Sequence, residues 1–224
     1  MQFILTTTWE DGTAHLAQRL IQELTTGKNV LWLVSGGSNI KASVTAMNNI
    51  SEELSRQLTV MLADERYGDV GHADSNWKQL MDAGFEANYA QMLPVLHDGL
   101  NFEKTAETYQ KTATWAFADA DVVIAQLGIG TDGHIAGILP HSIATEANQT
   151  AVVGYEGDDF KRITLTFPAL QSCTAVYAFA FGETKRAALS ALQLETLPAS
   201  TQPAQILKQV PEVYIYNDQL GEQS

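Results

Sequence analysis

Short apolar runs alternate with longer amphipathic stretches along most of the chain. The runs are rich in β-branched, aromatic and other apolar residues and are bounded by turn-forming residues, a pattern typical of buried strands. We predict strands at residues 2–7, 29–34, 58–63, 91–95, 121–127, 151–155, 162–167, 173–181 and 212–217, the first of them a short edge strand.

The stretches between these runs carry apolar residues at helical spacing. Leu16, Leu20 and Leu24 recur on one face, and Gly27 follows as a natural stop. We predict helices over residues 10–27, over 39–57 in two pieces broken near Asn48, from about residue 75, over 102–118 and over 183–195.

Apolar strands separated by helices predict an α/β fold. We expect a doubly wound, mostly parallel sheet with helices on both faces, in one Rossmann-like domain spanning residues 1–224. Ligands of such sheets bind outside the carboxyl ends of the strands. Three polar segments fall there, at residues 35–39, 64–76 and 128–134, so we expect the functional site where they meet.

The balance of charged residues limits the partners. The chain has 13 Lys and Arg against 26 Asp and Glu, a formal net charge of −13. This balance argues against nucleic acid and anionic membranes as partners, because neutralising phosphates needs a basic face. A small anionic substrate remains compatible, since a few Arg and Lys side chains can hold one phosphate locally.

Cysteine content and the N-terminal segment bear on the cellular compartment. The single cysteine, Cys173, excludes an internal disulfide and a cysteine-rich zinc site. The first residues lack a basic segment followed by a long apolar one, and no window reaches the roughly 20 apolar residues of a membrane span. We expect a cytoplasmic protein, either a monomer or a small homo-oligomer.

The first polar segment has the composition of a phosphate-binding loop. Gly36 and Gly37 let backbone N–H groups approach an anion, and Ser35 and Ser38 add hydroxyl donors. A plain turn from a strand into a helix uses the same residue types, so the pattern alone leaves both interpretations open.

The second polar segment places Asp64, Glu65 and Arg66 at the carboxyl end of a strand. The Arg66 guanidinium either pairs with the neighbouring carboxylates or presents its planar fork to a substrate oxyanion or phosphate. Further along, the sequence Asp-Ser-Asn at residues 74–76 is typical of a helix cap, which explains it adequately.

The third polar segment, LGIGTDGHIAGILP at residues 127–140, contains a glycine pattern that resembles a dinucleotide-binding turn. That pattern needs a helix directly after its last glycine, Gly133. Pro140 and the glycine before it leave room for a turn or two at most, and Asp132 would repel the pyrophosphate. The pattern therefore argues against a dinucleotide site.

Asp132 and His134 in this segment form the strongest candidate for catalysis. A histidine in a cleft is a natural general base, and a carboxylate two residues away can fix its tautomer. The alternative is a surface histidine beside a turn-forming Asp-Gly. A metal site from Asp132, His134 and His141 lacks any tight ligand spacing, so we expect no metal there.

Basic residues are scarce, so their positions carry information. Arg162 begins a predicted strand, and Lys185 opens a predicted helix at the carboxyl end of another. A helix N-terminus disfavours a cation, so Lys185 makes more sense if it reaches an anionic ligand. A solvated surface lysine is the alternative.

Five motifs occur in series: SGGS, DER followed by DSN, GIGTDGH with its proline, RITLTFPAL and FGETKRAAL. Together they resemble the 6-phosphogluconolactonase family and its superfamily with the glucosamine-6-phosphate deaminases. The resemblance implies hydrolysis of 6-phospho-D-glucono-1,5-lactone, a phosphosugar lactone of the pentose phosphate pathway, with no cofactor.

The resemblance also implies roles for individual residues. His134 would activate water, Asp132 would support it, and Arg66 with Asp64 would line the lactone site. The Ser35–Ser38 loop would hold the phosphate with the two remaining basic residues, Arg162 and Lys185.

Departures from the family pattern leave alternatives open. Ile135 and Gly137 replace a usual Thr and Ser, and Asn39 and Gly68 fall where Thr-Pro and Val-Pro are frequent, so another phosphosugar lactone is conceivable. In the deaminase loop a Glu precedes the proline; here Leu139 occupies that place and cannot transfer protons. A non-catalytic sugar-phosphate sensor is the third alternative.

Overall fold

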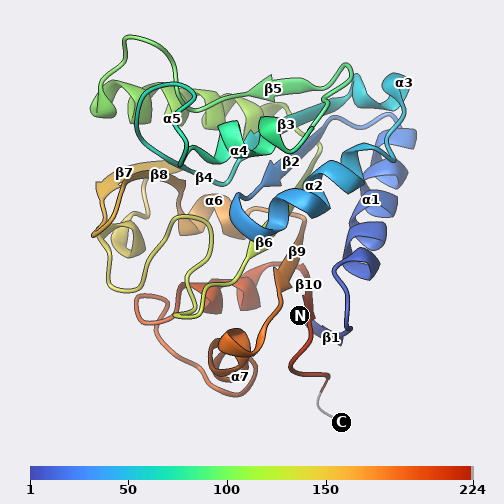
Figure 1. The fold of residues 1–224 in the computed structure, drawn as a ribbon, viewed down its shortest axis with the longest axis vertical. Helices are drawn as coiled ribbons and strands as arrows, with labels where there is room; N and C mark the ends of the chain where they lie inside the picture. Colours follow the sequence, from blue (N-terminus) through green and yellow to red (C-terminus); the bar gives the residue numbers. More distant parts are fainter. Residues whose placement is uncertain (223–224) are drawn as a thin grey trace.

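The computed structural model describes residues 1–222 and contains two sheets (Figure 1). The larger has the strand order β1-β10-β9-β6-β2-β3-β5, and every neighbouring pair in it is parallel. Its strands are β1 (Gln2–Leu5), β2 (Val30–Val34), β3 (Leu58–Leu62), β5 (Gln91–Leu93), β6 (Val122–Gly128), β9 (Ala175–Ala180) and β10 (Glu212–Asn217). Each coincides with a predicted strand, and β1 lies at an edge as predicted.

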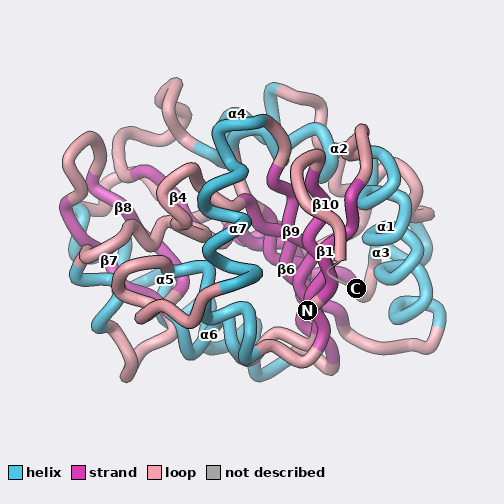
Figure 2. Tube along the Cα trace, turned by 90° about the horizontal axis from the view of Figure 1, so that it is seen from below, coloured by secondary structure: helices cyan, strands magenta, loops and turns pink. Residues whose placement is uncertain are grey.

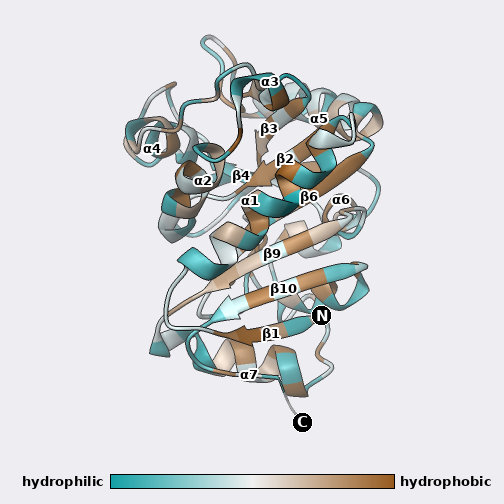
Figure 3. Cartoon of the chain, turned by 90° about the vertical axis from the view of Figure 1, so that its right-hand side faces the viewer, coloured by the Kyte–Doolittle hydropathy of each residue, from teal (hydrophilic) through white to brown (hydrophobic). Residues whose placement is uncertain are grey.

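The central strand β2 shows why these runs are so apolar. All of its residues are buried, and Trp32 lies in register between Val60 of β3 and Ile124 of β6. A parallel strand that is covered on both faces has no solvent-facing position for a polar residue. In Figure 3 the hydrophobic colour accordingly runs along β2 and β6.

Helices cover both faces of the main sheet, so the predicted doubly wound α/β fold is confirmed. They are α1 (Glu10–Thr25), α2 (Ile40–Met47), α3 (Glu52–Ser55), α4 (Asn76–Asp82), α5 (Phe102–Asp119), α6 (Phe167–Gln171) and α7 (Arg186–Leu194). Figure 2 shows α1, α2 and α3 on one side of the sheet and α5 and α6 on the other. The predicted break near Asn48 separates α2 from α3, and Gly27, with a φ of 81°, follows α1.

The smaller sheet is antiparallel and has the order β4-β8-β7. It is made of β4 (Asp64–Arg66), β7 (Val152–Glu156) and β8 (Lys161–Leu165). The polar segment at residues 64–76 therefore begins with a strand that we did not predict. β4 is short and polar, and only its pairing with β8 makes it a strand. That pairing places Arg66 directly opposite Arg162.

None of the helices in residues 1–222 is both long enough and apolar enough to cross a membrane.

Candidate active site

A cavity of about 170 Å³ lies at the carboxyl edge of the main sheet, where β2, β3, β6 and β9 end. Its wall contains all but one of the predicted site residues: Ser35, Gly36, Gly37, Ser38, Asp64, Arg66, His134, Arg162 and Lys185. The remaining one, Asp132, contacts the His134 ring. The three polar segments therefore meet, as the parallel topology predicted.

The first loop leaves β2 and turns tightly into α2. A Cβ on Gly36 would lie 2.0 Å from Asn76 Oδ1, and Gly37 has a φ of 66°, so both positions require glycine. Behind the loop, buried Gln126 donates from Nε2 to the Asn39 carbonyl at 2.9 Å. The loop is thus held from below by β6 while its other face lines the cavity.

On β4 the buried Glu65 carboxylate supports the site without lining the cavity. It accepts hydrogen bonds from Ser75 Oγ (2.9 Å) and from the backbone N–H groups of Arg66 (2.8 Å), Asn76 (2.7 Å) and Trp77 (3.0 Å). Burial raises the pKa of Glu65, and these four hydrogen bonds oppose the shift. Glu65 therefore joins β4 to the start of α4.

Asn76 is a cavity residue that the sequence interpretation missed. Ser75 caps α4 as predicted, because its Oγ accepts from the Lys78 N–H at 3.1 Å. Asn76 itself lines the cavity, and its Nδ2 donates to the Asp64 carbonyl at 2.9 Å and to the Asp64 carboxylate at 3.3 Å. The helix-cap pattern concealed this residue, and its place in the DSN motif was the available signal.

Asp132 and His134 form a close pair at the end of β6. Asp132 Oδ1 lies 2.6 Å from His134 Nδ1 and accepts from the His134 backbone N–H at 3.1 Å. The side-chain hydrogen bond holds the pKa of Asp132 down at about 2, so the carboxylate is ionised at neutral pH. In the neutral ring Nδ1 therefore carries the proton, and Nε2 keeps a lone pair.

Glycine at position 130 makes room for this pair. A Cβ there would lie 2.0 Å from His134 Nδ1 and 2.5 Å from Asp132 Oδ1. The glycines that resembled a nucleotide fingerprint thus serve the shape of the loop. Between Gly128 and Ser142, a segment described in full, the chain forms no helix, as the argument against a dinucleotide site anticipated.

Three cationic side chains reach the cavity from separate elements. Lys185 Nζ donates to the Ile129 carbonyl at 2.6 Å, and burial lowers the pKa of this amine. Arg66 Nη1 donates to the Asp74 carbonyl at 3.2 Å. Arg162 Nη2 donates to Asp159, at 2.8 Å and 3.1 Å to its two carboxylate oxygens.

Several polar atoms of the cavity wall have no partner. Ser35 Oγ, Arg66 Nε, Asn76 Oδ1 and Arg162 Nε are buried and make no hydrogen bond to any part of residues 1–222. Buried polar groups in folded proteins are nearly always paired. Their concentration in residues around one cavity favours a polar ligand that carries an anionic group for the serine and arginine donors and a hydroxyl for the Asn76 acceptor.

The departures from the family pattern have local physical reasons. A Cβ on Gly137 would lie 3.0 Å from the Cβ atoms of both Asp64 and Thr164, and one on Gly68 would lie 2.9 Å from the His72 ring. Ile135 is fully buried. Gly137 and Gly68 therefore respond to close packing against neighbouring side chains, and Ile135 belongs to the core.

Two further expectations concern histidine and metal. His141 does not line the cavity; its backbone N–H donates to the Ser200 carbonyl at 2.7 Å. Within residues 1–222 no three His, Cys, Asp or Glu side chains are grouped so that they could hold a metal ion. The aromatic residues Phe179 and Phe181, in contrast, line the cavity and were not predicted to do so.

The fold and the cavity define a doubly wound α/β protein with a small polar ligand site at the carboxyl edge of its parallel sheet. Residues 7–215 match the family described as glucosamine-6-phosphate isomerases/6-phosphogluconolactonase. The chain belongs to this family, which confirms the resemblance drawn from its five motifs.

Proteins named for two different activities are similar to this chain. The 6-phosphogluconolactonase of Nostoc sp. is 29% identical over 170 residues, which cover 70% of this chain and 68% of that protein. The crystal structure of a 6-phosphogluconolactonase from Shewanella baltica matches with a TM-score of 0.81 at 22% identity, covering 97% of both chains. A monomeric glucosamine-6-phosphate deaminase matches with a TM-score of 0.78 at 19% identity, again covering 97% of both. The fold alone therefore does not choose between the two activities.

Proposed function

We propose that the protein hydrolyses 6-phospho-D-glucono-1,5-lactone to 6-phosphogluconate. The observation that carries this proposal is the Asp132–His134 pair beside a cavity whose wall also holds Arg66, Arg162 and Lys185. The reaction requires a general base that activates water and cationic side chains that bind the substrate phosphate. The Nostoc relative, named a 6-phosphogluconolactonase, supports the same substrate.

In the proposed mechanism His134 takes a proton from water through Nε2. Asp132 holds the opposite ring nitrogen and stabilises the imidazolium that forms. The resulting hydroxide attacks the lactone carbonyl, and the ring C–O bond breaks as the tetrahedral intermediate collapses. His134 then returns its proton to the departing ring oxygen, and the carboxylic acid product releases its own proton to solvent.

The substrate is held at two ends. Its phosphate is bound by the Ser35–Ser38 loop together with Arg162 and Lys185, because a planar guanidinium and backbone N–H groups match phosphate geometry. Arg66 stabilises the negative charge that develops on the lactone oxygen. Asp64, which is buried in the wall, accepts from a sugar hydroxyl.

The loop after His134 favours a lactonase over a deaminase. Ring opening and deamination need an additional proton-transfer group, and the residue before Pro140 is Leu139, an apolar side chain that does not line the cavity. Hydrolysis of a lactone, which is already an activated ester, needs one base and correct positioning.

The test is the rate of loss of freshly prepared 6-phosphogluconolactone, followed by acid release above the spontaneous background. We expect kcat to fall by about 10²-fold or more in His134→Ala, the scale of losing a general base. His97→Ala, which removes an exposed histidine outside the cavity, is the matched control and should keep the wild-type rate.

Each alternative has its own result. Equal rates in wild type and His134→Ala would reject the assigned base. Release of ammonia from glucosamine 6-phosphate by the wild type would show a deaminase. Binding of the phosphosugar without turnover of either compound would show a sensor.

A further inference from the structure

The tip of the β7–β8 hairpin, residues 157–160, places a carboxylate of the protein on the arginine assigned to the substrate phosphate. We propose that Asp159 is a displaceable internal ligand of Arg162, which the substrate phosphate replaces on binding. This inference rests on the proposed function, and it makes Asp159 a specificity-determining residue that lies outside the recognised motifs.

The geometry of Arg162 shows an incomplete interaction. Its side chain is only 11% exposed, yet a single terminal nitrogen, Nη2, makes both contacts to Asp159. Arg162 Nε is buried and has no partner among the described residues. A guanidinium that binds a carboxylate or phosphate in full uses two nitrogens side by side. Nη1 makes no hydrogen bond within residues 1–222, so the terminal end of the guanidinium keeps donor capacity for a second anion.

Asp159 is placed to leave easily. Its side chain is 57% exposed, and an ion pair with a solvated partner contributes little net stability. It belongs to a turn that is closed by the Gly157 N–H donating to the Phe160 carbonyl at 2.9 Å. Since that closure uses backbone atoms alone, rotation of the Asp159 side chain away from Arg162 leaves the hairpin intact.

Phe160 supports the arginine whether or not Asp159 is in contact. Its ring centroid lies 5.7 Å from the Arg162 guanidinium carbon and 5.2 Å from that of Arg66, the residue paired opposite it on β4. Cations are attracted to aromatic rings at this distance. The ring thus helps to keep Arg162 in place for the incoming phosphate and Arg66 in place for the lactone.

Competition between two anions gives selectivity. A phosphate dianion replaces the single carboxylate charge and can add a hydrogen bond from Nη1, whereas an unphosphorylated lactone has no group that compensates for the loss of Asp159. The internal carboxylate therefore weakens every ligand somewhat and weakens the unphosphorylated sugar most. Its removal should improve phosphate binding and leave the chemical step unaffected.

The experiment compares Asp159→Asn with Asp158→Asn. Both remove one negative charge from the same turn, but Asp158 makes no ion pair with any described residue. Inorganic phosphate is titrated by calorimetry at fixed ionic strength, and KM and kcat are measured for the phosphorylated lactone. We expect Asp159→Asn to lower both the Kd of phosphate and KM by about 2- to 5-fold, the range of one exposed ion pair, with kcat unchanged.

Asp158→Asn should match the wild type. A higher Kd in Asp159→Asn would overturn the proposal, because it would show that Asp159 orients Arg162 productively. Equal effects of the two variants would show that only the net charge of the turn matters, and this result would also reject the proposal. Phosphate binding separates this test from the proposed function. If the wild type binds phosphate but leaves the lactone intact, the lactonase function is rejected, and the effect of Asp159 on phosphate binding can still be measured. Unchanged phosphate binding in Arg162→Ala rejects the internal-ligand proposal.

Discussion

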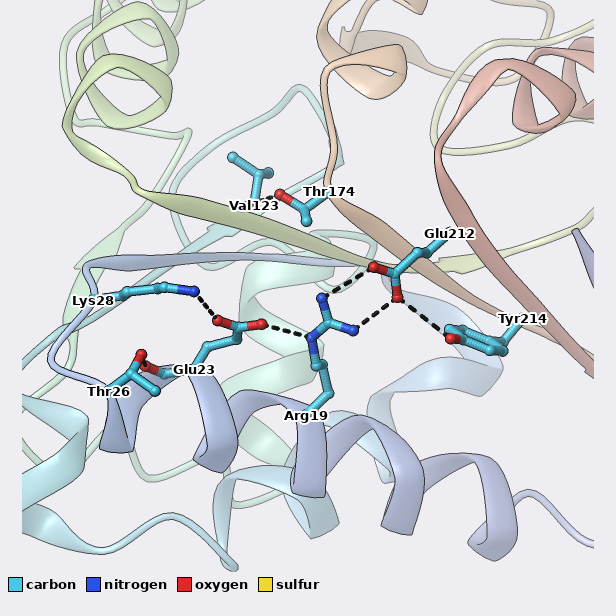
Figure 4. A network of polar contacts seen from close by, with 8 residues as sticks. All are labelled: Arg19, Glu23, Thr26, Lys28, Val123, Thr174, Glu212 and Tyr214. Atoms are coloured by element: carbon cyan, nitrogen blue, oxygen red, sulfur yellow. Dashed lines mark hydrogen bonds and ion pairs between the residues drawn. The ribbon is translucent and has the colours of Figure 1, made fainter.

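Arg19 and Arg162 have the same side chain, but the guanidinium of Arg19 makes more of its possible hydrogen bonds than that of Arg162 does. Arg19, on α1, uses all three guanidinium nitrogens: Nε donates to Glu23 at 2.8 Å, and Nη1 and Nη2 donate to the two carboxylate oxygens of Glu212 at 2.7 Å and 3.3 Å (Figure 4). Arg162 uses one nitrogen, and its buried Nε has no partner among residues 1–222.

The neighbours of the two arginines extend the contrast. Around Arg19 the network closes, since Lys28 donates to Glu23 at 2.6 Å and the Tyr214 hydroxyl donates to Glu212 at 3.3 Å (Figure 4). Around Arg162 the polar atoms of the cavity wall remain open. A completed charge network stabilises the fold, whereas an incomplete one in a concave site keeps its binding capacity for a ligand.

Removing Arg162 should have the largest effect on substrate binding. We expect Arg162→Ala to raise KM for the phosphorylated lactone by about 10-fold or more, because a hydrogen bond to a charged group is worth about 1.5–3 kcal/mol. The free energy of unfolding should fall by no more than about 1–2 kcal/mol, since the ion pair with the exposed Asp159 and the contact with the Phe160 ring are each worth about 1 kcal/mol or less. Steady-state kinetics and urea unfolding of the same preparation measure both. A KM that stays at the wild-type value would mean that the arginine does not hold the phosphate.

Removing Arg19 should have the complementary outcome. We expect Arg19→Ala to lower the free energy of unfolding by about 1–2 kcal/mol at pH 7 and to leave kcat and KM unchanged, because it leaves Glu212 without its cation and the buried Glu23 with Lys28 alone. The hydrogen bond from Arg19 lowers the pKa of Glu212, so this stabilisation is present above the ordinary pKa and is lost as the pH falls through the lowered one.

Unfolding curves of Arg19→Ala and wild type should therefore converge in acid. A loss of activity without a loss of stability would contradict the structural role of this cluster and would connect the two regions.

The main sheet could be predicted because its signal is local. β2 is apolar at every position, and Gly27 and Asn48 mark real helix ends, so each element can be recognised from its own residues. β4 could not be predicted in the same way. Its three residues are Asp64, Glu65 and Arg66, and only the distant strand β8 makes them a strand.

The candidate site divides along the same line. His134, Arg66 and the glycine loop could be predicted from residue type and position at strand ends. Asn76 and Asp159 could not, because one is concealed in a helix cap and the other reaches the site only through the pairing of β8 with β4. The roles of His134, Arg66 and the glycine loop can be predicted from their own sequence positions. The roles of Asn76 and Asp159 depend on their contacts with Asp64 and Arg162 in the folded protein.

Asp64 and Glu65 provide the smallest and most specific test of the comparison. The two buried carboxylates are adjacent on β4, but four donors satisfy Glu65, whereas Asp64 has only the side-chain amide of Asn76 at 3.3 Å. Burial raises the pKa of Asp64 against the opposing pull of the nearby arginines. The folded state therefore binds a proton at Asp64 more readily than the unfolded chain does. As the pH rises above the ordinary pKa of an aspartate, ionisation of Asp64 lowers the free energy of unfolding of the protein.

We accordingly expect Asp64→Asn, which cannot ionise, to raise the free energy of unfolding by about 1 kcal/mol at pH 7 while weakening substrate turnover. The gain should vanish below about pH 4, where the wild-type carboxyl is protonated in both states. Glu65→Gln is the matched control; it presents an NH₂ group to backbone donors and should destabilise at every pH. A loss of stability in Asp64→Asn at pH 7 would show that Asp64 is satisfied like Glu65 and belongs to the fold. A gain that persists in acid would show that the gain does not come from removing a buried charge. A gain in stability together with a loss of turnover would show that the Asp64 carboxylate lowers the stability of the fold and is needed for turnover.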